Sequence, residues 1–168
     1  MPNWCTNQVI LRHSDKSKIE AVFEEVTKGV ECELFQMLRP MPLAEEEEGN
    51  EGWYTWRLDN WGTKWDAEIF HSVMENDNEV VVDFDTAWSP PIELFEFLLK
   101  DGWEIEAAYH EPGMGLVGRF TGSGGEVVQN DSYEWNYDAV EPFKHIPEEL
   151  VEWANLKDSL ALYEEENQ

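Results

Sequence analysis

The sequence predicts an α+β domain of the ferredoxin-like class, an antiparallel sheet with two helices on one face. Segments with strand and helix periodicity follow one another in the order strand, helix, strand, strand, helix, strand. The length of 168 residues suits one domain with a core of its own, and nine Trp, eight Phe and five Tyr supply large apolar side chains. We expect the domain over residues 1–146 and an acidic helix and tail over 147–168.

The first strand and the first helix have the clearest patterns. Residues 4–13 (WCTNQVILRH) alternate as a half-buried strand does. The following helix can be capped by Ser14 or Asp15 and ends near Gly29. Its apolar residues fall at helical spacing, at Ile19, Val22, Phe23 and Val26.

Residues 30–65 lose both periodicities and predict an irregular insertion after the first helix, because they include the Pro-, Glu- and Gly-rich stretch LRPMPLAEEEEGNEG. Residues 67–74 predict the next strand. After a turn at 76–78, the strand EVVVDFDTAW has Val80, Val82 and Phe84 on one face and Asp83 and Asp85 on the other.

The second half of the chain continues the alternation. Ser89 is expected to cap a second helix that buries Ile92, Phe95, Leu98 and Leu99. The next strand, 103–111, turns Glu104 and Glu106 outward. A hairpin over 116–121 and 126–131 and a last helix from Pro147 complete the prediction, and that helix carries Glu148, Glu149 and Glu152.

The charge balance excludes several partners. The chain has 37 acidic and 11 basic residues, a formal net charge of -26, so we expect no direct binding to nucleic acid or to an anionic membrane. Cys5 and Cys32 have neither disulfide-framework nor zinc spacing, and no apolar run has signal or membrane-spanning length. We therefore expect a cytoplasmic protein without a metal or another cofactor.

The stretch DNWGTKWD (59–66) groups aromatic and polar residues in a way that suits either a ligand pocket or a structural corner. We favour the corner, with Lys64 held by acids and Gly62 needed for its backbone freedom. We expect Trp61 and Trp65 to pack near Trp88 and Tyr109. The candidate cluster comprises Asn60, Trp61, Gly62, Lys64, Trp65, Asp66, Trp88, Tyr109 and Glu111.

The sequence contains no recognisable catalytic motif. The four histidines lack metal-binding spacing, and the pair His110 and Glu111 has no third residue nearby to orient it. We therefore expect a non-enzymatic protein and assign no catalytic residue. The alternative is a small-molecule-binding or hydrolytic domain that uses Asp66, Lys64 and Glu111.

The acidic residues suggest two roles. They can serve solubility, or they can imitate the phosphates of DNA and occupy the basic groove of a DNA-binding enzyme. On the predicted strands, four acids should share the sheet face that the helices leave open, and the last helix extends them. The expected acidic interaction surface is Asp83, Asp85, Glu104, Glu106, Glu148, Glu149 and Glu152.

Five blocks of sequence carry a resemblance to a known family: MPNWCTNQVI, RPMP, WYTWRLDNWGTKWDA, FDTAWSPP and YHEPGMGLVG. Over residues 1 to about 120 the chain resembles the YubB-type family of ferredoxin-like domain proteins. The resemblance implies a ferredoxin-like fold and an accessory protein of bacteriophages, prophages or conjugative plasmids, without an established activity. We expect its partner to be a basic host protein, such as a DNA-binding defence enzyme. The blocks include Trp4, Asn7, Asn60, Trp61, Gly62, Lys64, Trp65, Asp66, Trp88, Pro90, Glu111 and Gly118.

Overall fold

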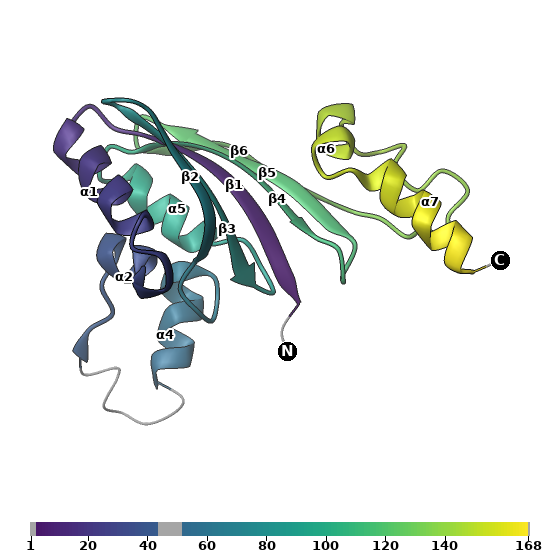
Figure 1. Cartoon of the computed structure of the whole chain (residues 1–168), viewed down its shortest axis with the longest axis horizontal. Helices are drawn as coiled ribbons and strands as arrows, with labels where there is room; N and C mark the ends of the chain where they lie inside the picture. Colours follow the sequence, from purple (N-terminus) through teal and green to yellow (C-terminus); the bar gives the residue numbers. More distant parts are fainter. Residues whose placement is uncertain (1–2, 44–51, 168) are drawn as a thin grey trace.

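The computed structural model describes residues 3–43 and 52–167, in which six strands form one antiparallel sheet with the order β2-β3-β1-β4-β5-β6 (Figure 1). The order β2-β3-β1-β4 is the ferredoxin-like one that the sequence predicts. The hairpin β5–β6 extends this sheet beyond β4. The strands are β1 (Trp4–Arg12), β2 (Glu68–Asn76), β3 (Glu79–Ala87), β4 (Glu104–Glu111), β5 (Leu116–Ser123) and β6 (Glu126–Glu134).

Two helices, α1 (Lys16–Val26) and α5 (Ile92–Leu99), cover one face of this sheet, as expected (Figure 1). Asp15 caps α1, because its carboxylate accepts a hydrogen bond from the Ser17 N–H at 3.0 Å. Beyond α5, Gly102 adopts a left-handed φ of 85° at the turn into β4. The start of α1 and the turn after α5 thus lie where the sequence predicts.

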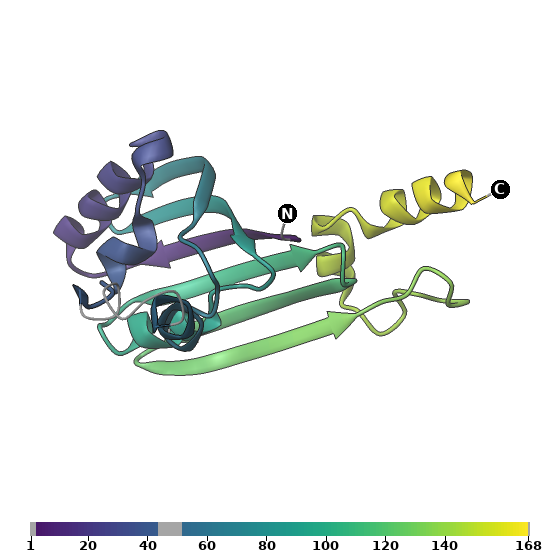
Figure 2. The same ribbon diagram turned by 90° about the horizontal axis from the view of Figure 1, so that it is seen from below.

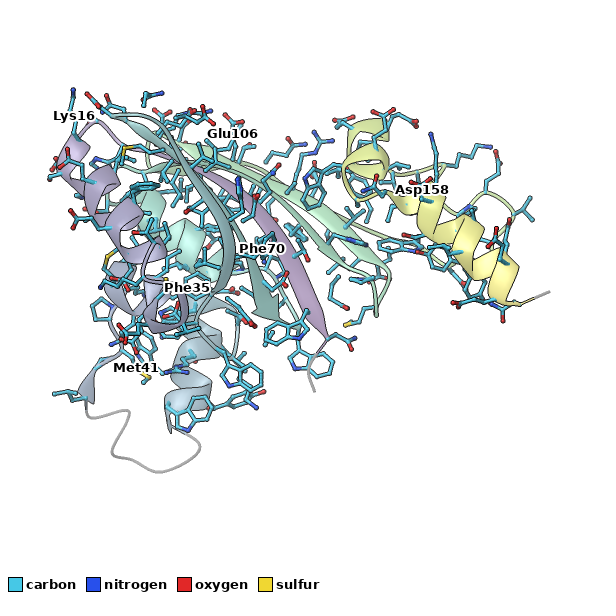
Figure 3. The ribbon with its side chains drawn as sticks, in the orientation of Figure 1. Lys16, Phe35, Met41, Phe70, Glu106 and Asp158 are labelled. Carbon is cyan, nitrogen blue, oxygen red and sulfur yellow. The ribbon has the colours of Figure 1, made fainter. Side chains whose placement is uncertain are left out.

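The main core lies between these helices and the sheet. Val9, Val82 and Ala107 are direct cross-strand partners on β1, β3 and β4, so all three side chains point to the helices. Each large apolar side chain buried here contributes on the order of 1.5–3 kcal/mol. Phe35 lies between the helices and the sheet (Figure 3) and packs edge-on against Phe84.

The insertion is more regular than its sequence suggests. A short 3₁₀ helix, η1 (Gly29–Glu31), is followed by α2 (Leu34–Leu38), and α4 (Gly52–Trp61) leads to the Trp-rich corner. The expectation of an irregular segment was wrong at these helices because long-range contacts support them. The glutamates of the insertion lie at 44–51, outside the described residues.

Ser89 does not cap α5, contrary to the expectation. The N-cap position is Pro91, which offers no side-chain hydrogen bond. The Ser89 hydroxyl instead donates to the carbonyl oxygen of Gly62 at 2.7 Å and so joins the Trp-rich corner to the end of β3. A pattern of Ser before two Pro residues cannot distinguish a local cap from this long-range bond.

The C-terminal region contains two helices rather than the single helix expected, α6 (Glu148–Trp153) and α7 (Leu156–Glu166). The chain breaks between them at Asn155, whose φ of 51° is left-handed. The two helices lie at the opposite end of the long axis from α1 and α2 (Figures 1 and 2). They build a second core with β5, made of Val117, Trp135, Ile146, Leu150, Val151 and Leu156.

No helix in the described part of the chain is long and apolar enough to cross a membrane.

Gly62 supplies the first testable prediction. Its φ is 83°, and an added Cβ would lie 2.0 Å from Glu93 Oε2 and 3.2 Å from the backbone nitrogen of Ile92. Gly62→Ala should therefore lower the free energy of unfolding by about 1–2 kcal/mol from backbone strain alone. The contacts with Glu93 and Ile92 should add to this loss, and denaturant unfolding would measure it.

Gly124→Ala is the matched control. Gly124 has a φ of 62°, but nothing lies within 4 Å of the position of an added Cβ. Gly124→Ala therefore introduces backbone strain without the close contacts. A smaller loss at Gly62 than at Gly124 would contradict a tight corner at this position.

Candidate functional site

Most of the Trp-rich corner is structural. Trp61 is fully buried, and its ring packs edge-on against Phe35 and Trp56, each with ring centroids 5.8 Å away. Its indole N–H donates to the carbonyl oxygen of Arg39 at 3.0 Å. Asn60 donates to the carbonyl oxygen of Trp56 at 2.8 Å. Both side chains thus donate to backbone carbonyl oxygens rather than line a pocket.

Asp66 holds α2 in place. Its carboxylate accepts hydrogen bonds from the N–H groups of Phe35 at 2.8 Å, Gln36 at 2.9 Å and Ala67 at 2.7 Å. Phe35 and Gln36 lie in the first turn of α2, where N–H groups have no partner within the helix. Burial raises the pKa of Asp66 although these donors oppose the shift. The role of Asp66 is therefore that of a helix cap supplied from a distance.

Lys64 and Trp65 are the members of the corner that face outward. Trp65 is 36% exposed, and its ring lies 6.1 Å from that of Trp4. The Lys64 ammonium lies 4.8 Å from the Trp65 ring and 5.8 Å from the Tyr54 ring. We expected acids to hold Lys64, but among the described residues no carboxylate comes within ion-pair distance of it. Aromatic faces hold this cation instead.

The corner is joined to the end of β3, but the ring contacts found among the described residues link Trp61 to Phe35 and Trp56 and link Trp65 to Trp4, rather than to Trp88 or Tyr109. The Thr63 hydroxyl donates to the carbonyl oxygen of Ala87 at 2.9 Å, next to Trp88. Trp88 is 47% exposed and has a left-handed φ of 73°. Tyr109 is directly opposite Gly118 on β5, whose missing Cβ leaves room for the ring. Burial raises the pKa of Tyr109 to about 12.

Glu111 is a buried carboxylate with a structural task. Its two oxygens accept hydrogen bonds from the N–H groups of Gly113 and Met114, both at 2.8 Å. They therefore close the turn between β4 and β5. The residues that the alternative hypothesis combined, Asp66, Lys64 and Glu111, are thus engaged in three separate contacts.

The predicted acids of the sheet all lie on the face opposite α1 and α5, which we term the far face. Direct cross-strand pairing joins Asp85 to Thr6 and Asp83 to Gln8, and it joins Glu106 to Ile10 and Glu104 to Arg12. Partners in an antiparallel ladder point to the same side. Figure 3 shows Glu106 on this side and Phe35 on the other.

Several of these acids have partners. Arg12 binds both Glu79 and Glu106, the latter at 2.5 Å. The Asp83 carboxylate lies 2.9 Å from the His71 ring, and the Thr6 hydroxyl donates to Asp85 at 2.7 Å. Glu104 is exposed and belongs to no ion pair within the described residues. The acidity of the far face is therefore partly compensated.

The C-terminal segment covers part of the far face, which the sequence had suggested to be open. The second core places Leu150 and Trp153 near Ala108, and the Trp153 indole N–H donates to Gln8 Oε1 at 3.2 Å. The predicted acids of α6 flank this contact: Glu149 binds Arg119 of β5 at 2.8 Å, Glu148 binds Lys157, and Glu152 is exposed.

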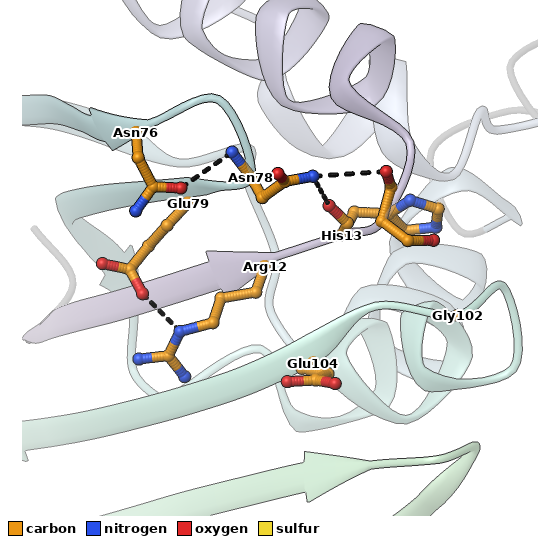
Figure 4. A pocket seen from close by; sticks show the side chains of 8 residues that line it. Arg12, His13, Asn76, Asn78, Glu79, Gly102 and Glu104 are labelled. Atoms are coloured by element: carbon orange, nitrogen blue, oxygen red, sulfur yellow. Dashed lines mark hydrogen bonds and ion pairs between the residues drawn. The ribbon is translucent and has the colours of Figure 1, made fainter.

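Two of the shallow hollows on the far face lie beside α6 and at the end of the sheet. One, of about 250 Å³, lies between Gln8 and Ile10 of the sheet and Glu149 and Trp153 of α6. The other, of about 380 Å³, lies at the end of the sheet near Arg12 and Glu104 (Figure 4). In the latter, the Arg12 guanidinium is already bound to Glu79 (Figure 4). Arg12 in the larger hollow and Glu149 in the smaller one are thus paired within the protein, whereas Glu104 keeps a free carboxylate among the described residues.

The geometry does not favour nucleophilic catalysis. Burial raises the pKa of the Cys5 thiol to about 12 and that of Cys32 to about 11, so both are protonated at neutral pH. In residues 3–43 and 52–167, no group of three or more His, Cys, Asp or Glu side chains could hold a metal ion.

Asp66 and Asp59 give a matched pair of variants within one stretch. Asp66→Ala should lower the free energy of unfolding by about 1–3 kcal/mol, because three N–H groups lose their acceptor. Asp59 is exposed, so Asp59→Ala should change stability by less than about 0.5 kcal/mol. Thermal and denaturant unfolding would measure both. Equal effects would refute the structural role of Asp66.

His110 gives a prediction about pH. Its ring lies 5.4 Å from Trp135, and burial lowers its pKa. The unfolded chain therefore binds this proton at a higher pH than the folded chain does. The contribution of neutral His110 to stability should be complete above its ordinary pKa of about 6.5 and should be lost as the pH falls.

His110→Phe keeps a ring against Trp135 and removes the titration. The free energy of unfolding of the variant should fall less steeply than that of the parent between about pH 7 and pH 5. Parallel pH profiles of the two proteins would show that His110 does not contribute.

Comparison with known proteins places the fold in a family. A family model described as a ferredoxin-like domain in Api92-like protein matches residues 60–152, more than half of the chain. The match begins in the Trp-rich corner and ends in α6.

No curated protein matches the sequence. Among solved structures, the chain is similar to the crystal structure of a protein api92 from Yersinia pseudotuberculosis, with 25% identity and a TM-score of 0.51. That similarity covers 62% of this chain and 40% of the other chain. The family match and the shared fold together show that the chain belongs to the family of ferredoxin-like domains of Api92-like proteins.

Proposed function

We propose that the protein is a non-catalytic binding module whose acidic surface docks on a basic partner protein. The partner we infer is a DNA-binding enzyme of a host cell, whose basic groove the protein would occupy in place of DNA. In this proposal the protein acts in the cytoplasm and is encoded by a phage, a prophage or a plasmid, as its resemblance to the YubB-type family suggests.

The observation that carries this proposal is the charge of the folded surface. Among the described residues, 25 acidic side chains are exposed and only five basic ones. Four of the five exposed bases are already paired with carboxylates of the protein: Lys16, Lys28, Lys144 and Lys157. A surface of this kind attracts basic partners over long distances and speeds their association.

The acids are spread over folded elements, which supports docking on a partner. Glu104 and Glu106 stand on β4, and Glu148, Glu149 and Glu152 stand on α6. Carboxylates on rigid elements keep fixed spacings, whereas those of a disordered acidic tail do not. Fixed spacing is what a substitute for the phosphate rows of a duplex requires.

The alternative of a small-molecule-binding or hydrolytic pocket in the Trp-rich corner has less support. Trp61 is buried, Asn60 and Asp66 satisfy backbone groups, and Glu111 closes a separate turn. The members that face outward, the half-buried Lys64 and the exposed Trp65, form a surface rather than an enclosed site.

A matched pair of charge variants tests the proposal. The double variant Glu104→Gln, Glu152→Gln removes two exposed acids from the surface that we propose for docking, the far face of the sheet with α6. Glu20→Gln with Glu24→Gln removes two exposed acids from α1, on the other face of the sheet. Both pairs change the net charge by the same amount. The first should weaken partner binding several-fold, and the second should leave it nearly unchanged.

The assay is capture of partners from bacterial extract at about 0.05 M and about 0.5 M salt, since exposed charges are screened more strongly at the higher concentration. Duplex DNA should displace the captured partner from the protein. A ternary complex of partner, DNA and protein would contradict the mimicry. Equal losses in the two variants would indicate an effect of net charge alone and would contradict a docking surface.

A further inference from the structure

Three indoles remain exposed at one end of the sheet. Trp4 begins β1 and is 37% exposed, Trp65 follows α4 and is 36% exposed, and Trp88 follows β3 and is 47% exposed. Trp4 is the cross-strand partner of Ala87, and the backbone N–H of Trp88 donates to the carbonyl oxygen of Asn3 at 2.9 Å. The three residues therefore belong to one neighbourhood, which we term the indole patch.

The patch is costly to maintain. Trp88 has a φ of 73°, and a bulky side chain rarely adopts this left-handed conformation. Nearly half of this residue faces water and gains nothing from burial. By contrast, Trp61 and Trp103 are almost completely buried. Strain at an exposed aromatic residue suggests that its position serves contact with another molecule.

Two carboxylates lie on the same face of the sheet as Trp4. Thr6, two residues after Trp4 on β1, is opposite Asp85 on β3, and Asp85 is opposite Glu68 on β2. Glu68 is exposed, and Asp85 is half-buried and accepts a hydrogen bond from Thr6. Aromatic faces next to carboxylates suit a cation with a flat apolar surface.

The protein already uses this kind of contact nearby. The Arg39 guanidinium lies 4.3 Å from the Phe97 ring, and that of Arg57 lies 4.8 Å from the Trp61 ring. The Lys64 ammonium lies 4.8 Å from the Trp65 ring. Three of its own cations thus rest on aromatic rings around the corner. An anionic ligand would instead meet the field of a chain with a net charge of -26.

We propose that Trp4, Trp65 and Trp88 anchor arginine side chains of the basic partner, with a guanidinium stacked on an indole and paired with Glu68 or Asp85. This anchor rests on the proposed function and adds a chemical preference to it. Acidic residues alone attract lysine and arginine alike, whereas a planar guanidinium stacks on an indole better than an ammonium does.

Two peptides of equal length and charge, ten arginines and ten lysines, test the anchor. Their dissociation constants for the full chain are measured by fluorescence anisotropy at low and moderate salt. The parent protein should bind both in a salt-dependent manner and should bind the arginine peptide about tenfold more tightly. Trp4→Leu with Trp65→Leu should reduce this ratio to nearly one through loss of arginine affinity.

Trp88→Gly separates function from folding. Glycine adopts a left-handed φ without strain, so this variant should keep or raise the melting temperature while it lowers the preference for arginine several-fold. Phe97→Leu is the control. Phe97 is an exposed aromatic residue of the helix layer, with the same exposed fraction as Trp65, and its loss should leave the ratio unchanged.

The outcomes distinguish the two proposals. If the parent binds both peptides equally, or if the indole variants keep the preference, the anchor is refuted and the acidic docking function stands. If the parent binds neither peptide at low salt, both are refuted. Binding of a neutral oligosaccharide that is lost in the same variants, without an arginine preference in the parent, would also refute the anchor.

Discussion

The register of β1 with its two neighbours is the constraint on which the arrangement of side chains depends. β1 pairs with β3 on one side and β4 on the other, so one alignment decides the orientation of three strands. In this alignment Val9 and Leu11 point to the helices, and Gln8 and Arg12 point to the far face. A shift of β1 by one residue would place Gln8 and Arg12 in the core and Val9 and Leu11 in water.

That separation lets a highly acidic chain form a core. Repulsion among the exposed carboxylates destabilises the folded state. Burial of the apolar face of the sheet contributes the favourable free energy that outweighs this repulsion. Two of the few bases link different elements through ion pairs. Arg12 binds Glu79 and Glu106 and so joins three strands, and Arg119 joins β5 to α6 through Glu149. The remaining excess of acids lies on the outside, where water and salt screen it.

The sequence predicted the parts of the fold that periodicity specifies. The alternation of β3 and β4 and the helical spacing in α1 gave the ferredoxin-like order, which the family and the structure confirm. It did not predict α2, because α2 depends on the carboxylate of Asp66, about thirty residues away. The same limit applies to Ser89, whose partner Gly62 is distant in sequence.

For the candidate site, composition identified the right residues but not their directions. The stretch around Trp61 and Trp65 contains one indole turned inward and one turned outward, and no local pattern separates them. The cover on the far face was missed for a related reason. Trp135, Tyr137 and Phe143 lie in a loop without periodicity, yet they pack into the second core.

The second core has a consequence for the way the molecule opens. It shares no buried residue with the main core and meets the sheet mainly through Val117, Ala108 and Tyr133. Such a cluster forms its own cooperative unit, with a lower opening free energy than the whole domain. Amide hydrogens of α6 and α7 should therefore exchange with solvent before those of β1 and β3. During such an opening the sheet remains folded, and the hollow beneath Trp153 becomes part of an uninterrupted surface.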